Sequence, residues 1–308
     1  MRQIRKQNGA FSGSDRIPKG RAPDTITPGC LVLEGGAFRA VYGEGVLDAL
    51  MRAGLNFQCT IGVSAGALNG FNYVSGQIGR AARINLNYRH DSRYVGLGAY
   101  RTSGSVIGFR FAFEDFDRIE SLDRARFFDP ARRFLAVATD CRTGQPVYFE
   151  KGQCGDIFRA ICASASMPYF SRPVEVDGIP CLDGGCCQKI PYQWALDQNF
   201  EKIVLVRTLT MDFRREEKAS DQKLANLVYG RKYPAFAAVQ GQSAATANRQ
   251  CDEIEALAAS GRIFVIAPSK DLGISKLEKD VNRLAAWYVL GYNDCRRALP
   301  ALKAWLRS

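Results

Sequence analysis

The sequence predicts an α/β fold in which helices pack on a largely parallel sheet. Two short apolar runs, residues 30–33 and 59–63, each end at small residues, and each is followed by a stretch with helical periodicity. Strand–turn–helix units in succession are typical of parallel sheets, because the helix carries the chain back to the edge where the next strand starts. The composition is that of a soluble globular protein, with 46% hydrophobic and 24% charged residues in a chain of 308.

The first half of the chain supplies both units. We expect a buried strand at 30–33, then a helix from about residue 39 that ends before Gly54. A second strand at 59–63 leads into a helix from 65 to about 79. Residues 88–130 break the pattern with scattered glycines, aromatic side chains and a charged stretch, so we interpret them as an insertion. This insertion and residues 211–260 are the two alternatives for a lid over a functional site.

The second half continues the sheet. Apolar runs predict strands at 134–139, 146–149, 174–176, 181–182, 202–206 and 262–267. We expect a helix at 156–165 and a polar, helix-rich span at 211–260. A further helix at 276–290 carries an apolar stripe of Leu277, Val281, Leu284, Ala285 and Tyr288.

These elements predict a core over residues 28–210, which residues 211–308 complete within the same domain. Residues 1–27 are polar and basic, with Asp15 the only acidic side chain among the first 22. We expect this leader to be disordered and solubilising. Attraction of its basic side chains to anionic lipid is the alternative interpretation.

The net charge of +11 favours anionic partners. No nucleic-acid-binding motif occurs, so we expect no specific nucleic acid, and peripheral contact with an anionic membrane is the alternative partner. No run is long and apolar enough for a membrane span or a signal peptide, which indicates a cytoplasmic protein. The ten cysteines form no C-x-x-C pair, and there is one histidine, so we expect no metal site and reduced, buried thiols.

A candidate nucleophile lies between the second strand and its helix. Gly62-Val63-Ser64-Ala65-Gly66 matches G-x-S-x-G, in which a sharp strand-to-helix turn lifts the serine hydroxyl clear of the sheet. Gly62 and Gly66 allow that turn, and the helix N-terminus favours developing negative charge. A purely structural turn is the alternative for these five residues.

The base that activates Ser64 cannot be the usual histidine of an α/β-hydrolase triad. No acidic residue lies between Ser64 and His90, the only histidine, so the chain order Ser…Asp/Glu…His is not available. A carboxylate or a lysine must serve instead. The best candidate is Asp183, which closes an apolar segment and is followed by Gly184 and Gly185. An ordinary Asp-Gly turn is the alternative; as a base, Asp183 needs a pKa raised by a partly desolvated pocket.

The segment after the first strand is a candidate oxyanion hole. Gly35, Gly36, Ala37 and Arg39 stand at the start of the first helix, where successive backbone N–H groups can bind an anion. The segment contains neither G-x-x-x-x-G-K-[ST] nor G-x-G-x-x-G, which disfavours nucleotide binding.

In this order, the three motifs resemble those of the patatin-like phospholipases, which carry G-G-G-x-R/K-G, then G-x-S-x-G, then D-G-G or D-G-A. The likeness spans about residues 29–210; residues 139–141, 164–168, 203–206 and Pro191 more loosely resemble the bacterial branch. The resemblance implies a three-layer α/β/α sandwich and a Ser–Asp dyad that hydrolyses acyl esters of lipids, commonly phospholipids. In that scheme Ser64 attacks, Asp183 takes its proton, and no metal or organic cofactor takes part.

The chain departs from the family pattern at Ala37 and Ala40, where glycine is usual. Alanine keeps the N–H but adopts positive φ only at a cost, so a hole that needs such geometry would be compromised. Two other functions stay open beside the hydrolase. One is an acyltransferase that uses the same dyad, and the other is a catalytically weak or inert lipid-binding relative.

Overall fold

An eight-stranded mixed sheet forms the centre of the protein, and the computed structural model describes residues 12–308. The strand order is β10-β9-β2-β3-β5-β8-β7, with β6 paired to β5. The first five of these strands run parallel, whereas β6 and β8 run antiparallel to β5, and β7 runs antiparallel to β8. The strands are β2 (Thr27–Leu33), β3 (Phe57–Val63), β5 (Arg133–Asp140), β6 (Pro146–Glu150), β7 (Val174–Val176), β8 (Ile179–Asp183), β9 (Ile203–Val206) and β10 (Phe264–Ile266).

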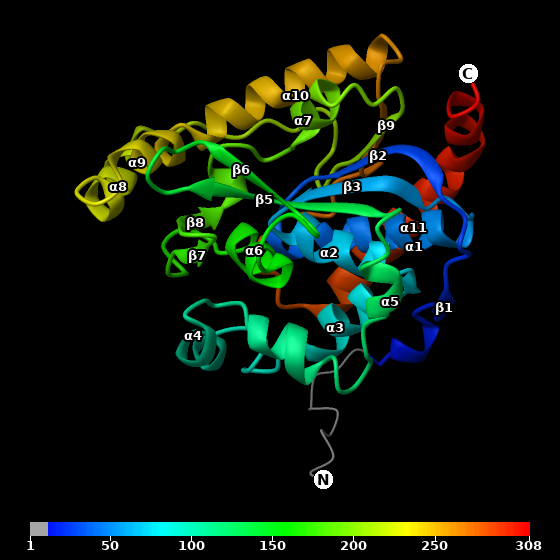
Figure 1. Ribbon diagram of the computed structural model, residues 1–308, viewed down its shortest axis with the longest axis horizontal. Coiled ribbons are helices and arrows are strands. Elements are labelled where there is room, and N and C mark those ends of the chain that lie inside the picture. The colour runs from blue at the N-terminus through cyan, green and yellow to red at the C-terminus, as the bar shows by residue number, and fades with distance from the viewer. Residues whose placement is uncertain (1–11) are drawn as a thin grey trace.

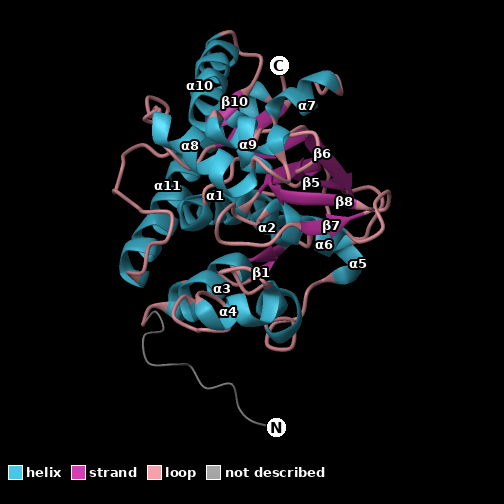
Figure 2. Ribbon diagram, turned by 90° about the vertical axis from the view of Figure 1, so that its left-hand side faces the viewer, coloured by secondary structure: helices cyan, strands magenta, loops and turns pink. Residues whose placement is uncertain are grey.

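Helices cover both faces of this sheet, which confirms the predicted three-layer α/β/α fold (Figures 1 and 2). The helices are α1 (Val41–Arg52), α2 (Ala65–Val74), α3 (Arg80–Tyr88), α4 (Leu97–Ser103), α5 (Arg124–Phe127), α6 (Ile157–Ser164), α7 (Tyr192–Asp197), α8 (Ala219–Tyr229), α9 (Pro234–Gly241), α10 (Ser243–Ala259) and α11 (Val281–Trp305). In Figure 1, α7 and α10 lie above the sheet, and α1, α2, α6 and α11 lie below it.

The apolar runs of the central strands follow from this double cover, because both faces of each strand are buried. Leu31 and Leu33 of β2 belong to the core cluster shared with α1, α2 and α11. The alternating residues Cys30 and Val32 belong to the second cluster, shared with α7 and α10. A strand buried on both faces shows no alternation of polar and apolar residues. Residues 30–33 of β2 are accordingly all apolar.

The register on β5 brings two distant segments together. β6 pairs with β5 over residues 135–139, so β3 and β8, which pair with the same strand, must share its other edge. There Val63 of β3 is the partner of Val137, and Asp183 of β8 is the partner of the next residue, Ala138. Val63, the residue before Ser64, and Asp183 therefore pair with consecutive residues of β5, which brings Ser64 and Asp183 close together.

The segment after residue 211 shares the sheet and the core of the preceding segment. β10 pairs with β9 in parallel, and α11 packs against α1. The two helices are very close: a Cβ on Gly45 would lie 2.1 Å from the Tyr288 carbonyl oxygen, and one on Gly291 would lie 2.0 Å from that of Tyr42. Glycine is therefore required at both positions, because any side chain would force the helices apart.

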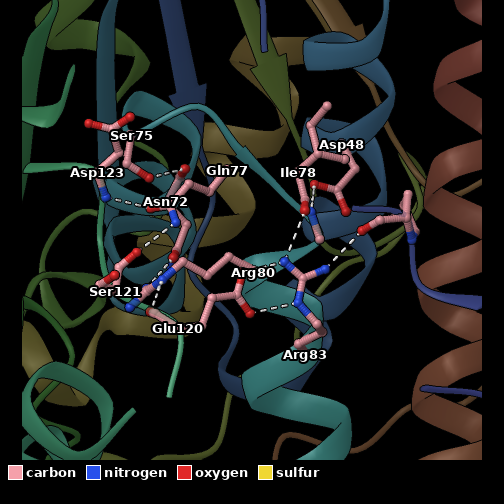
Figure 3. A network of polar contacts seen from close by, with 12 residues as sticks. Asp48, Asn72, Ser75, Gln77, Ile78, Arg80, Arg83, Glu120, Ser121 and Asp123 are labelled. Atoms are coloured by element: carbon pink, nitrogen blue, oxygen red, sulfur yellow. Dashed lines mark hydrogen bonds and ion pairs between the residues drawn. The ribbon is translucent and has the colours of Figure 1, made fainter. Parts of the chain in front are cut away.

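The predicted insertion at 88–130 contains α4 and α5 and is tied to the core through α3 (Figure 3). Arg83 of α3 forms an ion pair with Glu120, and Arg80 donates to the Glu120 carbonyl oxygen at 3.1 Å. Arg80 also donates to the Asn72 side chain of α2 at 2.7 Å. Because both arginines are buried, these contacts fix the insertion beside α2, the helix that follows Ser64.

Residues 12–27 differ from the predicted disordered leader. A short 3₁₀ turn occupies Ser14–Arg16, and β1 (Gly20–Arg21) pairs antiparallel with β4 (Gln77–Ile78). Ile17 and Ala22 are buried in the main core. This apolar burial and backbone pairing order the chain well before residue 28. Residues 1–11 lie outside the part of the chain that the structure describes.

Two predicted helix boundaries are wrong. The helix expected over 65–79 ends at Val74, because the Ser75 hydroxyl bonds to the Asn72 carbonyl oxygen and Gly76 has a φ of 71°. The helix expected over 276–290 begins at Val281 and continues to Trp305, because the Asp280 side chain caps its first N–H groups. Leu277 therefore lies in the preceding loop, and the buried stripe is Leu284, Ala285 and Tyr288.

No helix within residues 12–308 combines the length and the apolar composition that a membrane crossing requires.

Candidate active site

The Ser64 backbone has the strained conformation of a strand-to-helix elbow. Its φ and ψ are 57° and −127°, a region that costs a residue with a side chain on the order of 1–3 kcal/mol. The flanking glycines make the turn feasible. A Cβ on Gly62 would lie 2.5 Å from the Gly66 backbone, and one on Gly66 would lie 2.5 Å from the Leu33 carbonyl oxygen. Strain supported by such close packing is typical of a functional position.

Asp183 lies directly opposite this serine. The Ser64 hydroxyl donates a hydrogen bond of 2.6 Å to Oδ2 of Asp183, and both side chains are buried. The other carboxylate oxygen accepts from the Gly185 N–H at 2.7 Å, and Thr139 donates to the Asp183 carbonyl oxygen at 2.8 Å. A Cβ on Gly184 would lie 2.2 Å from the Val137 carbonyl oxygen, so the chain must continue with glycine there. Asp183 is thus held in one orientation.

Burial raises the pKa of Asp183, and the hydrogen bonds from Ser64 and Gly185 oppose part of that rise. A carboxylate with a raised pKa is a stronger base than an exposed one, while it can still be ionised at neutral pH. The pair therefore meets the geometric and the electrostatic requirements for proton transfer from the serine hydroxyl.

The candidate oxyanion segment borders the same cavity. Gly35, Gly36, Ala37 and Ser64 all line it. In the described part of the chain, the N–H groups of Gly36 and Ala37 have no hydrogen-bond partner. They can therefore donate to a negatively charged oxygen that develops beside Ser64.

Ala37 has the positive φ that glycine would supply more easily, at 50°. For a residue with a Cβ this costs about 1 kcal/mol. The alanine thus keeps the geometry of the hole at a small cost in stability. Ala40 has a φ of −69° and carries no such strain. Arg39 does not line the cavity with Ser64; its Nε donates to the Ile274 carbonyl oxygen, and it borders an adjoining outer cavity.

Ser164 is a supporting residue that the sequence reasoning did not single out as a site residue. Its hydroxyl accepts from the Ser64 N–H at 2.9 Å and donates to the Val137 carbonyl oxygen at 2.6 Å. It therefore ties the nucleophile elbow to β5. Its position four residues before Pro168, at the end of a predicted helix, was visible in the sequence, but its contact with Ser64 was not.

Two cavities of different character meet at Ser64. The first, which we call the apolar pocket, is lined by Phe38, Leu68, Phe71, Ile84 and Ile107, with buried polar side chains at Glu44 and Asn72. Burial, and then the nearby Asp48, raise the pKa of Glu44 well above its usual range, which favours the neutral form. Tyr94, Ile107 and Ala112 of the insertion form part of this wall.

The second cavity is lined by both Ser64 and Asp183. Five basic side chains line it and its outward continuation. Lys218 pairs with Glu216 at 3.0 Å. We call the region of the other four the basic basin: Arg39, Lys189, Arg215 and Lys276. Apart from Arg39, none of these was singled out from the sequence, because they come from segments far apart in the chain.

His90 is exposed and lines neither cavity. Among residues 12–308, no group of three or more His, Cys, Asp or Glu side chains is placed to hold a metal ion. The ten cysteines are all free thiols.

Comparisons with known proteins place these features in context. Residues 31–196 match the family model for patatin-like phospholipases, and residues 233–307 match a domain of unknown function, DUF6363. The chain is 31% identical over 280 residues to the uncharacterised protein YjjU of Escherichia coli, a match that covers 85% of this chain and 74% of YjjU. It is 29% identical over 164 residues to the uncharacterised NTE family protein Rv1063c of Mycobacterium tuberculosis, covering 52% of this chain and 43% of that protein.

Two solved structures resemble the chain more distantly. VipD from Legionella pneumophila aligns with a TM-score of 0.48 at 14% identity, covering 91% of this chain and 68% of that chain. The type III effector protein ExoU aligns with a TM-score of 0.42 at 14% identity, covering 94% of this chain and 54% of that chain.

Proposed function

This chain belongs to the patatin-like phospholipase family, as its motifs predicted, and we propose that it hydrolyses carboxylic esters of lipids through a Ser64–Asp183 dyad. The observation that carries the dyad is the 2.6 Å hydrogen bond from the Ser64 hydroxyl to the buried Asp183 carboxylate. The single histidine is exposed and lines neither cavity at Ser64, so the carboxylate is the base available to this serine.

In the first step, Ser64 Oγ attacks the ester carbonyl carbon while Asp183 accepts the hydroxyl proton. The carbonyl oxygen becomes negatively charged and accepts hydrogen bonds from the Gly36 and Ala37 N–H groups. The C–O bond to the alcohol then breaks, Asp183 returns the proton to the leaving alcohol, and the acyl group stays on Ser64.

In the second step, Asp183 takes a proton from a water molecule, which attacks the acyl-enzyme carbonyl. Collapse of the second intermediate releases the carboxylic acid and returns a proton to Ser64. The apolar pocket suits the acyl chain, because it lies beside Ser64 and carries large apolar side chains. The basic basin is then left for the alcohol part of the substrate.

We also propose that the mouth of the site contacts a membrane surface. Large apolar side chains are exposed near it, on α8, on α4 and in the loop before β7: Leu224, Leu227, Val228, Leu97, Tyr100, Tyr169 and Phe170. Leu224, Tyr169 and Phe170 border the cavities that lead to Ser64. Exposed apolar side chains combined with basic ones are typical of proteins that bind anionic lipid surfaces.

A fluorophosphonate probe and a short p-nitrophenyl ester test the nucleophile directly. The wild-type protein should be labelled and should hydrolyse the ester, whereas Ser64→Ala should lose both with its thermal unfolding unchanged. Ser260→Ala, which alters an exposed serine at the end of α10, is the matched control and should behave like wild type.

Retention of ester hydrolysis in Ser64→Ala would contradict the proposal. Ester cleavage that yields mainly transfer to an added alcohol in place of water would assign the same dyad to an acyltransferase.

A further inference from the structure

The basic basin gathers four cationic side chains from four distant segments next to the dyad. Arg39 follows the oxyanion segment, Lys189 follows β8, Arg215 lies before α8, and Lys276 lies in the loop before α11. Lys189, Arg215 and Lys276 line the same cavity as Ser64 and Asp183, and Arg39 joins them in its outward continuation. The apolar pocket, by contrast, is lined by a single basic side chain, Arg80. Arg80 already donates hydrogen bonds to the Asn72 side chain and to the Glu120 carbonyl oxygen.

Acidic side chains compensate this charge only in part: Asp183 lines the inner cavity, and Glu216 and Asp221 line its outward continuation. Within residues 12–308, neither Lys189 nor Lys276 forms an ion pair with a carboxylate. Arg215 approaches Glu34 at 3.8 Å, but that carboxylate also pairs with Arg207 at 3.5 Å and accepts from the Thr208 N–H at 2.7 Å. The basin therefore carries an excess of positive charge.

The cations also destabilise one another. Burial first, and then Arg215, lower the pKa of Lys189 to about 8, with a further contribution from Lys276. Burial, Arg215 and Arg39 lower the pKa of Lys276 in the same way. A bound anion would offset both the repulsion between these cations and the free-energy cost of burying them. An arrangement of this kind is what an anion-binding site requires before its ligand arrives.

Two contacts fix the basin relative to the reacting atoms. The Lys189 ammonium donates to the Gly185 carbonyl oxygen, and the Gly185 N–H holds the Asp183 carboxylate. On the other side, the Lys276 carbonyl oxygen accepts from the Phe38 N–H at 3.1 Å, next to the free N–H groups of Gly36 and Ala37. Lys189 and Lys276 are therefore anchored to the base and to the oxyanion segment, and neither lines the apolar pocket.

We propose that the basic basin is a head-group subsite that selects lipid esters whose alcohol portion carries a phosphate and no compensating cation. The inference rests on the proposed hydrolase function. With the carbonyl at Ser64 and the acyl chain in the apolar pocket, the alcohol portion extends into the basin. In a glycerophospholipid the phosphate is only a few bonds from the ester, which matches cations placed beside the dyad. A quaternary ammonium head group would bring a positive charge among four others and be disfavoured.

The test compares dihexanoyl-phosphatidylglycerol with dihexanoyl-phosphatidylcholine, both as monomers below their critical micelle concentrations. Monomeric substrates exclude attraction of the basic protein to a charged surface as the cause of a preference. The measured quantity is the ratio of kcat/KM for the anionic lipid to kcat/KM for the zwitterionic lipid. The wild type should favour phosphatidylglycerol, and Lys276→Gln and Arg215→Gln should each lower the ratio about ten-fold, as expected when one charged hydrogen bond is lost.

Lys303→Gln is the matched control, because it removes the same charge from an exposed position on α11 outside both cavities. It should leave the ratio unchanged. Labelling of Ser64 by the fluorophosphonate probe shows that each variant is folded. A second arm needs no variant: glycerol phosphate should inhibit hydrolysis of a neutral p-nitrophenyl ester by the wild type more strongly than inorganic phosphate does.

The outcomes separate the two proposals. An unchanged ratio in both basin variants, or a wild type without preference, would overturn the head-group subsite. Inhibition by inorganic phosphate as strong as that by glycerol phosphate would assign the basin to free phosphate and also overturn it. A wild type that hydrolyses neither the lipids nor the p-nitrophenyl ester would refute the hydrolase function, and the subsite with it.

Discussion

Replacing Asp183 by asparagine should abolish activity and at the same time stabilise the folded chain. The two side chains have the same shape, so the amide oxygen can still accept from the Gly185 N–H. The amide NH₂ can donate to the Ser64 hydroxyl oxygen where the carboxylate now accepts. The substitution therefore removes a negative charge and a proton acceptor while it keeps the local hydrogen bonds.

The catalytic loss follows from the direct contact between base and nucleophile. A positioned general base contributes about 10²–10⁴-fold to the rate, which corresponds to about 2.7–5.5 kcal/mol of transition-state stabilisation. The loss should lie toward the upper end of this range, because Asp183 serves in both steps and the only histidine, His90, is exposed.

The gain in stability follows from the raised pKa of Asp183. Because burial raises it, the ionised carboxyl is less favourable in the folded chain than in the unfolded chain. The stability of the wild type therefore falls as the pH rises from the ordinary carboxyl range through the raised pKa of the folded state. The asparagine variant does not ionise and avoids this loss. At neutral pH it should unfold at a higher temperature, by roughly 2–4 °C for each kcal/mol gained.

The assay combines kcat/KM on a p-nitrophenyl ester with thermal unfolding at an acidic and a neutral pH. Asp197→Asn, at an exposed position of α7, is the control for removal of one carboxylate. A variant that keeps more than about a tenth of the wild-type kcat/KM would show that Asp183 is not the base. A lower unfolding temperature at neutral pH would show that its charge stabilises the fold, contrary to the reasoning from burial.

Three other predictions concern the same site. The kcat/KM of the wild type should fall as the pH is lowered through the raised pKa of Asp183, so the acidic limb of its pH profile should lie above the ordinary carboxyl range; a limb within that range would contradict this. Gly35→Ala should lower kcat/KM by about 10–100-fold and also lower the unfolding temperature, because its Cβ would lie 2.9 Å from the Val63 carbonyl oxygen and 3.0 Å from the Ser64 Cβ and would displace the backbone that carries the nucleophile. Ala37→Gly, which relaxes a positive φ, should keep the activity and gain up to about 1 kcal/mol in the free energy of unfolding; a loss of activity in this variant would show that the alanine methyl group is required.

The fold could be predicted from the sequence because its central strands are buried on both faces and the first two are followed by small residues. The runs at 30–33 and 59–63 lie within β2 and β3, and the antiparallel pair β5 and β6 follows the predicted strands closely. The ends of helices were harder to predict. Asp280 could have signalled the start of α11 as an N-cap, but the apolar Leu277 extended the periodicity falsely into the preceding loop.

Ser64 and Asp183 could be proposed from the sequence because each lies in a local motif with its own glycines. The basic basin could not, because Lys189, Arg215 and Lys276 belong to no shared motif and meet only when α11 and the loop before it pack on the first half of the chain. Ala37 shows a different limit. The sequence marks it as a departure from glycine, but only the structure shows that it adopts a positive φ all the same.

The packing of α1 against α11 has a consequence for how the protein can be divided. The helix pair joins the two matched regions, residues 31–196 and 233–307, through contacts as close as those at Gly45 and Gly291. A fragment confined to 31–196 would contain the whole dyad, yet it would leave β2 as an open sheet edge and one face of α1 bare. During synthesis, Ser64 and Asp183 leave the ribosome well before α11, the helix that covers α1. We therefore expect the proposed dyad to reach its final geometry only after α11 has docked.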